Sequence, residues 1–316
     1  MRQNRDPALV EAFLRERCSG PVRDVAPVGR GDWSVAYAFR SDGADHVARF
    51  GAWLEDFEKD RVAAAYASAE LPVPQVLEVG EALGGYYAIS ERAYGTFLEA
   101  LDERRMRAIL PAFFAALDAA RRTDLSGTTG YGQWDATGAA PHASWQEALL
   151  AVGEDEPSSR THGWRERLAS SPLGDGPLEE ALACLRELAP GCPDERHLTH
   201  NDLLNRNVLV ADGRLQAVFD WGNSTHGDFV YELAQFTFWA PWHPAWRGVD
   251  LADEAQRHYE RIGLDVPGFE QRLRAYEIRI ALDGCTYNAF RERWDELEAT
   301  TRRLRPAVER QPVEPT

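Results

Sequence analysis

The chain has few cysteines and no long apolar run. Its four cysteines form no C-x-x-C pair and no cysteine/histidine spacing typical of zinc sites. No apolar stretch reaches the ~18 to 20 residues that a membrane helix needs. Residues 1–10 are polar and lack the apolar core of a secretory signal. These absences argue against a zinc site and a membrane helix, and we expect a reduced, cytoplasmic protein with no membrane partner.

Positive charge is also scarce. The sequence has 35 lysines and arginines against 51 aspartates and glutamates, which gives a formal net charge of −16 at pH 7. This balance argues against a nucleic-acid partner, because little would replace the counterions along a phosphate backbone. It suits a cationic small-molecule substrate, which a negative cleft attracts, although many proteins are acidic simply for solubility. With 316 residues the chain is long enough for two lobes with sizeable cores, and we expect a monomer.

The most informative pattern is a set of three polar residues near position 200. Asp202 is followed five residues later by Asn207, and Asp220 comes a hairpin's length further on. In phosphoryl transfer, such an aspartate accepts the proton of a substrate hydroxyl, and the asparagine and second aspartate hold the magnesium ions that neutralise the phosphates. The alternative is a polar loop before an ordinary hairpin. The spacing of Asp220 and the upstream His200 favour the kinase-like site.

The sequence between these residues supports that geometry. Residues 207–210 and 215–219 have the pattern of two short strands, and Asp212-Gly213 is typical of the turn between them. Pairing of the two strands would bring Asn207 and Asp220 to the same end of the hairpin. One metal site could then use both side chains.

A glycine-rich hairpin is expected near the N-terminus. Gly29, Gly31 and Ser34 precede a strand over 35–39, so their backbone N–H groups are placed to cover nucleotide phosphates. By itself this pattern is more often only a turn. Arg49 lies on the next expected strand, where it can pair with phosphate oxygens; the alternative is a surface salt bridge.

The following segments complete a first lobe. Residues 55–68 are helical in pattern, and Asp60 within them is expected to pair with Arg49 and aim it. Residues 91–95 are expected to link the two lobes, with the backbone of Glu91 and Ala93 contacting the adenine edge. We therefore divide the chain into a nucleotide-binding lobe (1–92), a catalytic and substrate lobe (93–305) and a disordered tail (306–316).

The second lobe is expected to be mostly helical. Residues 103–122 have a helical pattern, and Pro111 within them predicts a kink or a break between two helices. Residues 126–144 are rich in glycine, threonine, serine and alanine, and predict a long loop.

At this point the chain resembles a known family. The segments that carry the resemblance to the aminoglycoside phosphotransferase family are His200–Asn207, Asp220-Trp221 and Gly227-Asp228-x-x-Tyr231-Glu232-Leu233-Ala234. Further matches to the members that phosphorylate hygromycin B are Arg49, Lys59-Asp60-Arg61 and Phe236–Trp242. Two positions depart from the family pattern: Asn201 replaces the usual glycine, and Ser34 replaces a third glycine. Asparagine tolerates unusual backbone angles, and the serine hydroxyl can donate to a phosphate, so neither change predicts an inactive enzyme.

The resemblance implies a fold and an activity. The implied fold is α+β, protein-kinase-like and two-lobed, with a small β-rich N-terminal lobe and a larger, mostly helical C-terminal lobe. The implied reaction moves the γ-phosphoryl group of ATP or GTP, with Mg²⁺, to a hydroxyl of an aminoglycoside, with hygromycin B as the expected acceptor and antibiotic resistance as the role. Two alternatives stay open: a metabolic kinase acting on choline, a sugar, fructosamine or homoserine, and a catalytically silent nucleotide-binding protein.

The remaining site residues are assigned by chemistry and position. We expect His200 to brace the catalytic loop by hydrogen bonds. A cationic, hydroxyl-rich acceptor calls for carboxylates and flat aromatic faces. The candidates for contact with it are Asp228, Glu232, Trp239, Trp242, Asp283, Tyr287 and Asn288. For each tryptophan the alternative is a place in the core, and Asp228 and Glu232 could instead support the catalytic loop.

Overall fold

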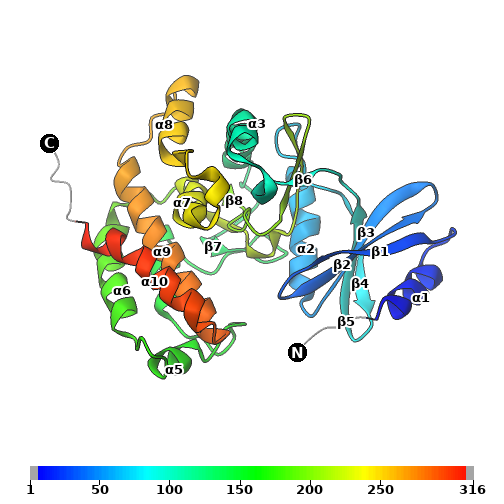
Figure 1. The fold of residues 1–316 in the computed structure, drawn as a ribbon, viewed down its shortest axis with the longest axis horizontal. Coiled ribbons are helices and arrows are strands. Elements are labelled where there is room, and N and C mark those ends of the chain that lie inside the picture. Colours follow the sequence, from blue (N-terminus) through cyan, green and yellow to red (C-terminus); the bar gives the residue numbers. More distant parts are fainter. Residues whose placement is uncertain (1–5, 311–316) are drawn as a thin grey trace.

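Two lobes make up the computed structural model, which describes residues 6–310 (Figure 1). The N-terminal lobe is an antiparallel sheet with the strand order β1-β2-β3-β5-β4. Its strands are β1 (Arg23–Arg30), β2 (Ser34–Ser41), β3 (Ala44–Gly51), β4 (Val76–Ala82) and β5 (Gly85–Glu91). The predicted two-lobed α+β fold is confirmed.

Two helices flank this sheet. Helix α1 (Pro7–Arg17) begins at Asp6, whose carboxylate accepts the backbone N–H of Ala8 at 2.9 Å, a standard N-cap. Its Val10 and Leu14 are fully buried in a small core with the sheet. Helix α2 (Leu54–Ala63) lies between the sheet and the larger lobe (Figure 1).

The C-terminal lobe is built on helices packed around α9. The helices are α3 (Glu103–Arg121), α4 (Trp145–Leu150), α5 (Trp164–Ala169), α6 (Gly176–Leu188), α7 (Val230–Trp239), α8 (Leu251–Ile262), α9 (Phe269–Phe290) and α10 (Trp294–Glu309). Helix α9 contacts α5, α6, α7 and α10. Because neighbours cover it on several sides, α9 is buried over most of its length and can hold α7 firmly beneath the catalytic loop.

Two small sheets in this lobe carry the chemistry-bearing segments. One has the order β10-β9-β6 and the other β7-β11-β8. Their strands are β6 (Thr96–Phe97), β7 (Gly132–Gln133), β8 (His197–Thr199), β9 (Val208–Ala211), β10 (Arg214–Val218) and β11 (Thr225–Gly227). The chain therefore passes from β5 to a strand of the second lobe in a few residues. Gly95 in this connection lies so close to Val210 that a side chain would meet its carbonyl oxygen at 2.8 Å.

Two prolines lie inside helices. Helix α3 continues through Pro111, so of the two predicted outcomes the break is excluded and the kink stays a prediction. Helix α10 continues through Pro306 to Glu309, so the prediction of a disordered tail that begins at residue 306 is wrong. Packing overrides the local signal at α10, because Leu304 and Ala307 are buried and Arg274 donates to the carbonyl of Ala307 at 2.7 Å. Residues 311–316 of the predicted tail lie outside the described part of the chain.

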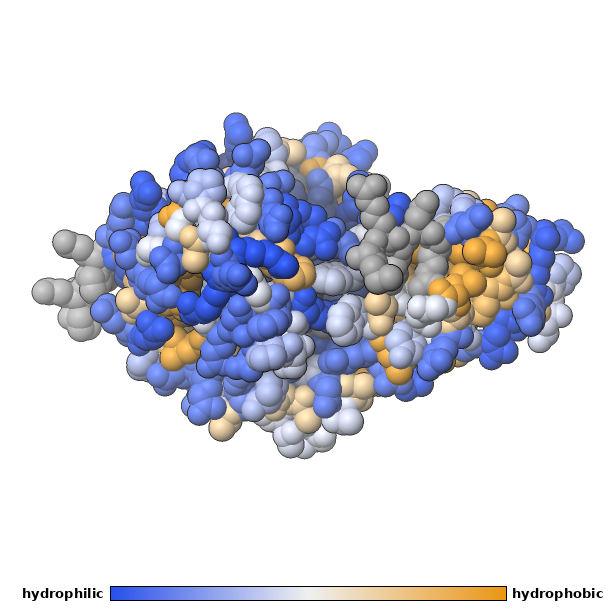
Figure 2. Space-filling view, turned by 90° about the horizontal axis from the view of Figure 1, so that it is seen from below, coloured by the Kyte–Doolittle hydropathy of each residue, from blue (hydrophilic) through white to orange (hydrophobic). Residues whose placement is uncertain are grey.

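The face seen from below differs between the two lobes. Hydrophilic side chains predominate over the larger lobe, with hydrophobic ones in scattered spots, whereas hydrophobic side chains form a larger patch over the sheet lobe (Figure 2). Within residues 6–310, no helix is both long enough and apolar enough to span a bilayer.

Candidate active site

The catalytic loop connects β8 to β9, and His200 fixes its shape. The ring Nε2 of His200 lies 3.0 Å from the carbonyl oxygen of Phe219, and the backbone N–H of Asp202 donates to Nδ1 at 3.2 Å. One ring nitrogen therefore donates and the other accepts, which requires the neutral imidazole. Burial lowers the pKa of His200 to about 4, so the ring is neutral at ordinary pH. These two hydrogen bonds connect the catalytic loop to Phe219, and the bracing role of His200 stays a prediction.

Asp202 is held by side-chain amides. Asn205 donates to Oδ1, and Asn223 donates to Oδ2 at 3.3 Å. Burial raises the pKa of Asp202 to about 7, and the negative charge of Asp220 adds to the effect. A carboxylate with a pKa near the working pH is well suited to accept a hydroxyl proton.

The hairpin brings Asn207 and Asp220 together as the sequence predicts. The N–H of Phe219 donates to the carbonyl of Asn207 at 3.0 Å, so Asp220 follows directly beside Asn207. The amide nitrogen of Asn207 donates to the carbonyl of Asp202 at 2.7 Å, which directs its oxygen elsewhere. Asp220 has a left-handed backbone (φ 69°) and a carboxylate that is 40% exposed.

These donors fit a magnesium ion. An amide oxygen and a partly exposed carboxylate are ligands that Mg²⁺ prefers, and it normally keeps several waters besides. The negative charge of Asp220 helps to raise the pKa of Asp202, so a divalent cation at this place would relieve the repulsion between the two carboxylates.

Arg49 links the sheet lobe to this centre. Its guanidinium lies 2.8 Å from Asp60 and 3.1 Å from Asp220, so the expected pair with Asp60 is present. Asp60 in turn accepts the backbone N–H of Trp221 at 2.7 Å. Burial raises the pKa of Asp60 to about 6, although the charge of Arg49 opposes that rise. The side chains of Arg49 and Asp60, together with the backbone N–H of Trp221, fix Asp220 relative to α2.

Lys59 has a role that the sequence analysis missed, since it names this residue only as part of the resemblance. It is the only lysine of the chain. Its ammonium group donates to the carbonyls of Gly222 and Ser224 at 2.8 and 3.2 Å and lies 4.7 Å from the ring centre of Trp134. Burial lowers the pKa of Lys59 to about 8. Lys59 thus secures α2 to the segment that follows Asp220, and the rarity of lysine was the available signal.

The glycine-rich loop is tied to the far end of the second lobe. The N–H of Gly31 donates to the carbonyl of Ser34 at 2.9 Å and closes the turn. Asp32 at the tip accepts the hydroxyl of Tyr287 and lies 2.9 and 3.1 Å from Arg291 and Arg293. Tyr287, a predicted acceptor contact, therefore bonds to the loop instead of pointing into open space.

Hydrogen bonds at the start of the segment that links the two lobes, residues 91–95 (the hinge), limit which backbone groups could contact an adenine edge. The N–H of Glu91 donates to Gln75 and that of Arg92 to Asp45, both at 3.1 Å. Ala93 is then the better candidate of the two predicted hinge residues for donating to a base.

Three of the predicted acceptor residues are buried, which does not fit that role. Asp228 is fully buried and accepts from Arg272 at 2.5 and 2.8 Å, from Tyr276 and from the N–H of Val230. Glu232 is 4% exposed and accepts the N–H groups of His200 and Asn201. Asn288 donates to Thr300 at 3.3 Å in the core. All three side chains are buried in contacts with neighbouring helices and loops. Both oxygens of Asp228 and Oε2 of Glu232 accept hydrogen bonds there, whereas Oε1 of Glu232 is buried without a hydrogen-bond partner among the described residues.

The other candidates remain accessible. Trp239 is half-buried, Trp242 is 42% exposed, and their ring centres lie 5.1 Å apart. Asp283 is 65% exposed and lies 3.4 Å from Arg279. An aromatic pair with an exposed carboxylate on α9 suits a cationic, saccharide-like molecule.

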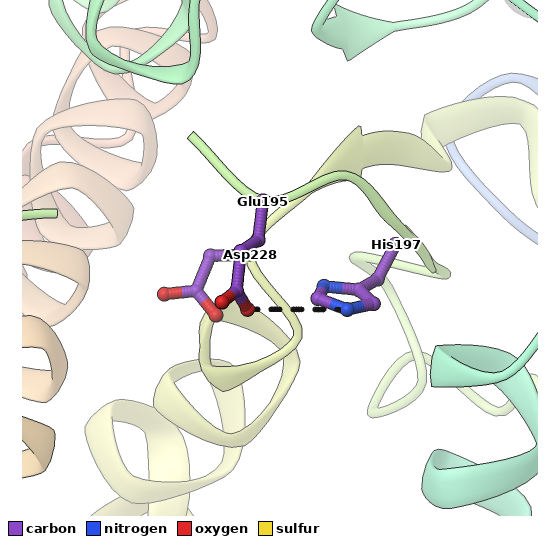
Figure 3. Close-up of side chains that lie close together, drawn as sticks. All are labelled: Glu195, His197 and Asp228. Atoms are coloured by element: carbon purple, nitrogen blue, oxygen red, sulfur yellow. Dashed lines mark ion pairs between the residues drawn. The ribbon is translucent and has the colours of Figure 1, made fainter. Parts of the chain in front are cut away.

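A second group of acidic and imidazole side chains is not a convincing metal site. Glu195, His197 and Asp228 lie close enough to share an ion (Figure 3). Both oxygens of Asp228 are already engaged by Arg272, whose positive charge would oppose a cation. Among the described residues, the oxygen donors at Asn207 and Asp220 are therefore the better place for magnesium.

The fold and site together define the class of protein. A sheet lobe with a glycine-rich loop, a helical lobe, and the set Asp202, Asn207 and Asp220 at their junction form a kinase-like phosphotransferase. The chain belongs to the phosphotransferase enzyme family, whose sequence model matches residues 28–276.

Individual relatives narrow the resemblance. The chain is 34% identical over 276 residues to the hygromycin-B 4-O-kinase of Escherichia coli. The aligned region covers 87% of this chain and 77% of the relative. The crystal structure of aminoglycoside phosphotransferase APH(4)-Ia aligns with a TM-score of 0.83 at 31% identity, over 96% of this chain and 98% of that one. A thermostable mutant of the same enzyme, in ternary complex with AMP-PNP and hygromycin B, aligns with a TM-score of 0.82 at 32% identity, over 95% and 97% of the two chains.

Proposed function

We propose that this protein transfers the γ-phosphoryl group of ATP to a hydroxyl of hygromycin B and thereby confers resistance. The observation that carries the proposal is the 34% identity to a hygromycin-B 4-O-kinase over 87% of the chain, which includes the catalytic loop and the aromatic end of α7. The accessible Trp239, Trp242 and Asp283 offer the aromatic faces and the carboxylate that such an acceptor needs.

The chemistry is a direct displacement. The acceptor oxygen forms a bond to the γ-phosphorus as the bond from that phosphorus to the β,γ-bridging oxygen breaks, and ADP leaves with the electron pair. The hydroxyl proton passes to a carboxylate oxygen of Asp202. Because the transition state is loose, positioning and neutralisation of charge matter more than the strength of the base.

Other residues hold the nucleotide. Asn207 and Asp220 would ligate Mg²⁺, which neutralises the β- and γ-phosphates when it is bound. Arg49 offers its positive charge to phosphate oxygens, with Asp60 aiming it. The backbone from Gly29 to Ser34 would cover the phosphates, and Glu91 or Ala93 would contact the base. Since one chain supplies every one of these groups, we also propose a monomer that works in the cytoplasm, where ATP is available.

A transfer assay tests the substrate. The purified protein is incubated with γ-labelled ATP, Mg²⁺ and, separately, hygromycin B, another aminoglycoside, choline or a simple sugar. We expect label on hygromycin B with the highest kcat/KM, and growth of a susceptible bacterium on the antibiotic when it expresses the protein. Efficient transfer to choline or a sugar without transfer to hygromycin B would assign the protein to the metabolic kinases instead.

Calorimetry tests the metal site separately. We expect Asp220→Ala to lose Mg²⁺-dependent binding of AMP-PNP, because the variant lacks the charged ligand. An unchanged affinity for the magnesium–nucleotide complex would show that Asp220 does not hold the metal.

A further inference from the structure

One face of α7 carries a row of polar side chains that the phosphotransfer chemistry does not explain. Glu232, Gln235 and Trp239 follow one another at spacings of three and four residues, so they lie on the same side of the helix. Glu232 lies beneath the catalytic loop, where it accepts the N–H groups of His200 and Asn201. Trp239 lies about 10 Å further along the helix, at its aromatic end. The row thus runs from the catalytic loop to the proposed acceptor surface.

Gln235 joins the two ends of this row. Its amide nitrogen donates to Oδ1 of Asn201, and its amide oxygen accepts the indole N–H of Trp239 at 3.1 Å. Glutamine can do both at once, whereas a glutamate could only accept and a hydrophobic residue could do neither. Both halves of the amide are used, so its orientation is fixed by the two partners.

The chain of donors continues to the catalytic carboxylate. The amide nitrogen of Asn201 donates to the carbonyl of Asn223 at 3.3 Å, and the side-chain nitrogen of Asn223 donates to Oδ2 of Asp202, also at 3.3 Å. The indole of Trp239 and the side-chain amides of Gln235 and Asn201 donate head to tail, so these bonds polarise one another. The last step differs, because Asn223 accepts with its backbone carbonyl and donates to Asp202 with its side-chain amide; this residue therefore transmits position.

Asparagine at position 201 suits both the backbone conformation and the hydrogen bonds of this position. Its backbone is left-handed, with φ at 64°, a conformation that favours glycine. Asparagine is among the few other residues that adopt it at small cost. A glycine would satisfy the backbone but would break the chain between Gln235 and Asn223. The departure from the usual glycine therefore supplies an amide without straining the catalytic loop.

We propose that Gln235 is a positioning residue, which couples acceptor contact at Trp239 to the orientation of Asp202 through Asn201 and Asn223. The proposal rests on the proposed function in one respect, that the phosphate acceptor contacts the aromatic end of α7. The ring centre of Trp239 lies 5.1 Å from that of Trp242 and 4.7 Å from that of Phe238. An acceptor bound on this cluster would therefore contact the same indole that donates to Gln235. Neither Gln235 nor Asn201 needs to touch the acceptor.

The test is a set of near-isosteric variants measured by steady-state kinetics. Gln235→Met keeps the length and packing of the side chain but removes both hydrogen bonds, Asn201→Gly removes only the amide, and Trp239→Phe removes the N–H but keeps an aromatic face. We expect each to lower kcat for acceptor phosphorylation roughly tenfold, the effect of one lost hydrogen bond at the transition state. The KM for ATP and the melting temperature should stay close to those of the wild type.

The double variant Gln235→Met/Trp239→Phe separates coupling from simple loss of contacts. If the two residues act in one chain of hydrogen bonds, the kcat of the double variant is no lower than that of the slower single variant. Gln216→Met is the matched control, because Gln216 is exposed on β10 and donates only to the carbonyl of Ala211; its kinetics should equal those of the wild type.

Several results would overturn the proposal. The proposal is wrong if Gln235→Met and Asn201→Gly both have a kcat within about twofold of that of the wild type. It is also wrong if the fold-losses of kcat in the two single variants multiply in the double variant. A Trp239→Phe variant with a raised acceptor KM and an unchanged kcat would reduce Trp239 to a stacking surface. Transfer to hygromycin B by the wild type reports on the proposed function alone. If the wild type prefers another acceptor, the same kcat ratios with that acceptor decide the role of Gln235.

Discussion

The catalytic centre and the acceptor surface of this protein are built in opposite ways. At the catalytic centre, charged groups are bonded to several partners: the buried Arg49 and Asp60 form an ion pair, Arg49 also reaches Asp220, and three asparagines donate to Asp202. At the acceptor surface, Trp242 and Asp283 are exposed, and Asp283 has one ion pair at 3.4 Å. Dense bonding fixes where charge sits during phosphoryl transfer, whereas a loosely bonded surface can change its ligand through a few substitutions. The effects of substitutions in the two regions should therefore differ, both in their size and in whether turnover, stability or acceptor affinity changes.

The largest effect is expected at the catalytic aspartate. Asp202→Asn should lower turnover by roughly 10²–10⁴-fold, the range for loss of a positioned base, while nucleotide still binds. The assay is kcat with saturating substrates together with calorimetric binding of AMP-PNP. Asp212→Asn is the control, since Asp212 lies in the hairpin turn with φ at 53°, which asparagine tolerates. Near wild-type kcat in Asp202→Asn would remove Asp202 from the chemistry.

The next largest effect is expected from breaking the buried ion pair. Arg49→Met should lower the free energy of unfolding by about 3 kcal/mol, because it leaves Asp60 buried without its partner. It should also raise the KM for ATP. The exposed Arg40, 3.7 Å from Asp45, gives the matched control: Arg40→Met should cost less than about 1 kcal/mol in urea unfolding. Equal losses in the two variants would contradict the contrast between a buried and an exposed pair.

A pH dependence of stability is expected from Glu232. Burial raises its pKa from 4.5 to about 7 in the folded state, so the folded protein binds the proton more tightly than the unfolded chain. The contribution of this bound proton to the free energy of unfolding is fully present below pH 4.5 and is lost as the pH rises through 7. The loss is about 3 kcal/mol.

The amide variant isolates this contribution. The glutamine in Glu232→Gln can still accept the two N–H groups but does not titrate. As the pH rises from 5 to 8, the free energy of unfolding of the wild type should therefore fall relative to that of the variant. Urea unfolding at several pH values measures it, with the exposed Glu260→Gln as control. A difference that does not change with pH would mean that Glu232 titrates normally.

The smallest effect is expected at the acceptor surface. Asp283→Asn should change stability by less than about 1 kcal/mol, because its ion pair is exposed to solvent. It should raise the KM for a cationic acceptor roughly threefold at low ionic strength, and less at high salt, since screening removes the attraction. Asp265→Asn, on the exposed loop before α9, is the control. A KM change that persists at high salt would point to a hydrogen bond in place of a long-range charge effect.

The sequence alone determined the parts of the site that are close in the chain. Asp202, Asn207 and Asp220 lie within one loop and one hairpin, so local backbone geometry brings them together in any fold that forms the hairpin. The lobes were also predictable, because strand and helix patterns change near residue 95. Asp60 was also predicted as the partner of Arg49, because it lies on the helical segment that follows the strand of Arg49.

Only the tertiary structure decided which polar residues face the acceptor and which support the fold. Asp228, Glu232 and Asn288 have the chemistry of acceptor contacts but are buried by packing on α9 and the catalytic loop. Asp32 and Tyr287 are 255 positions apart and meet because the two lobes close on each other. The alignment of Gln235 with Asn201 depends on the placement of α7 under the catalytic loop. Such contacts follow from the packing of distant elements, which no local pattern of residues specifies.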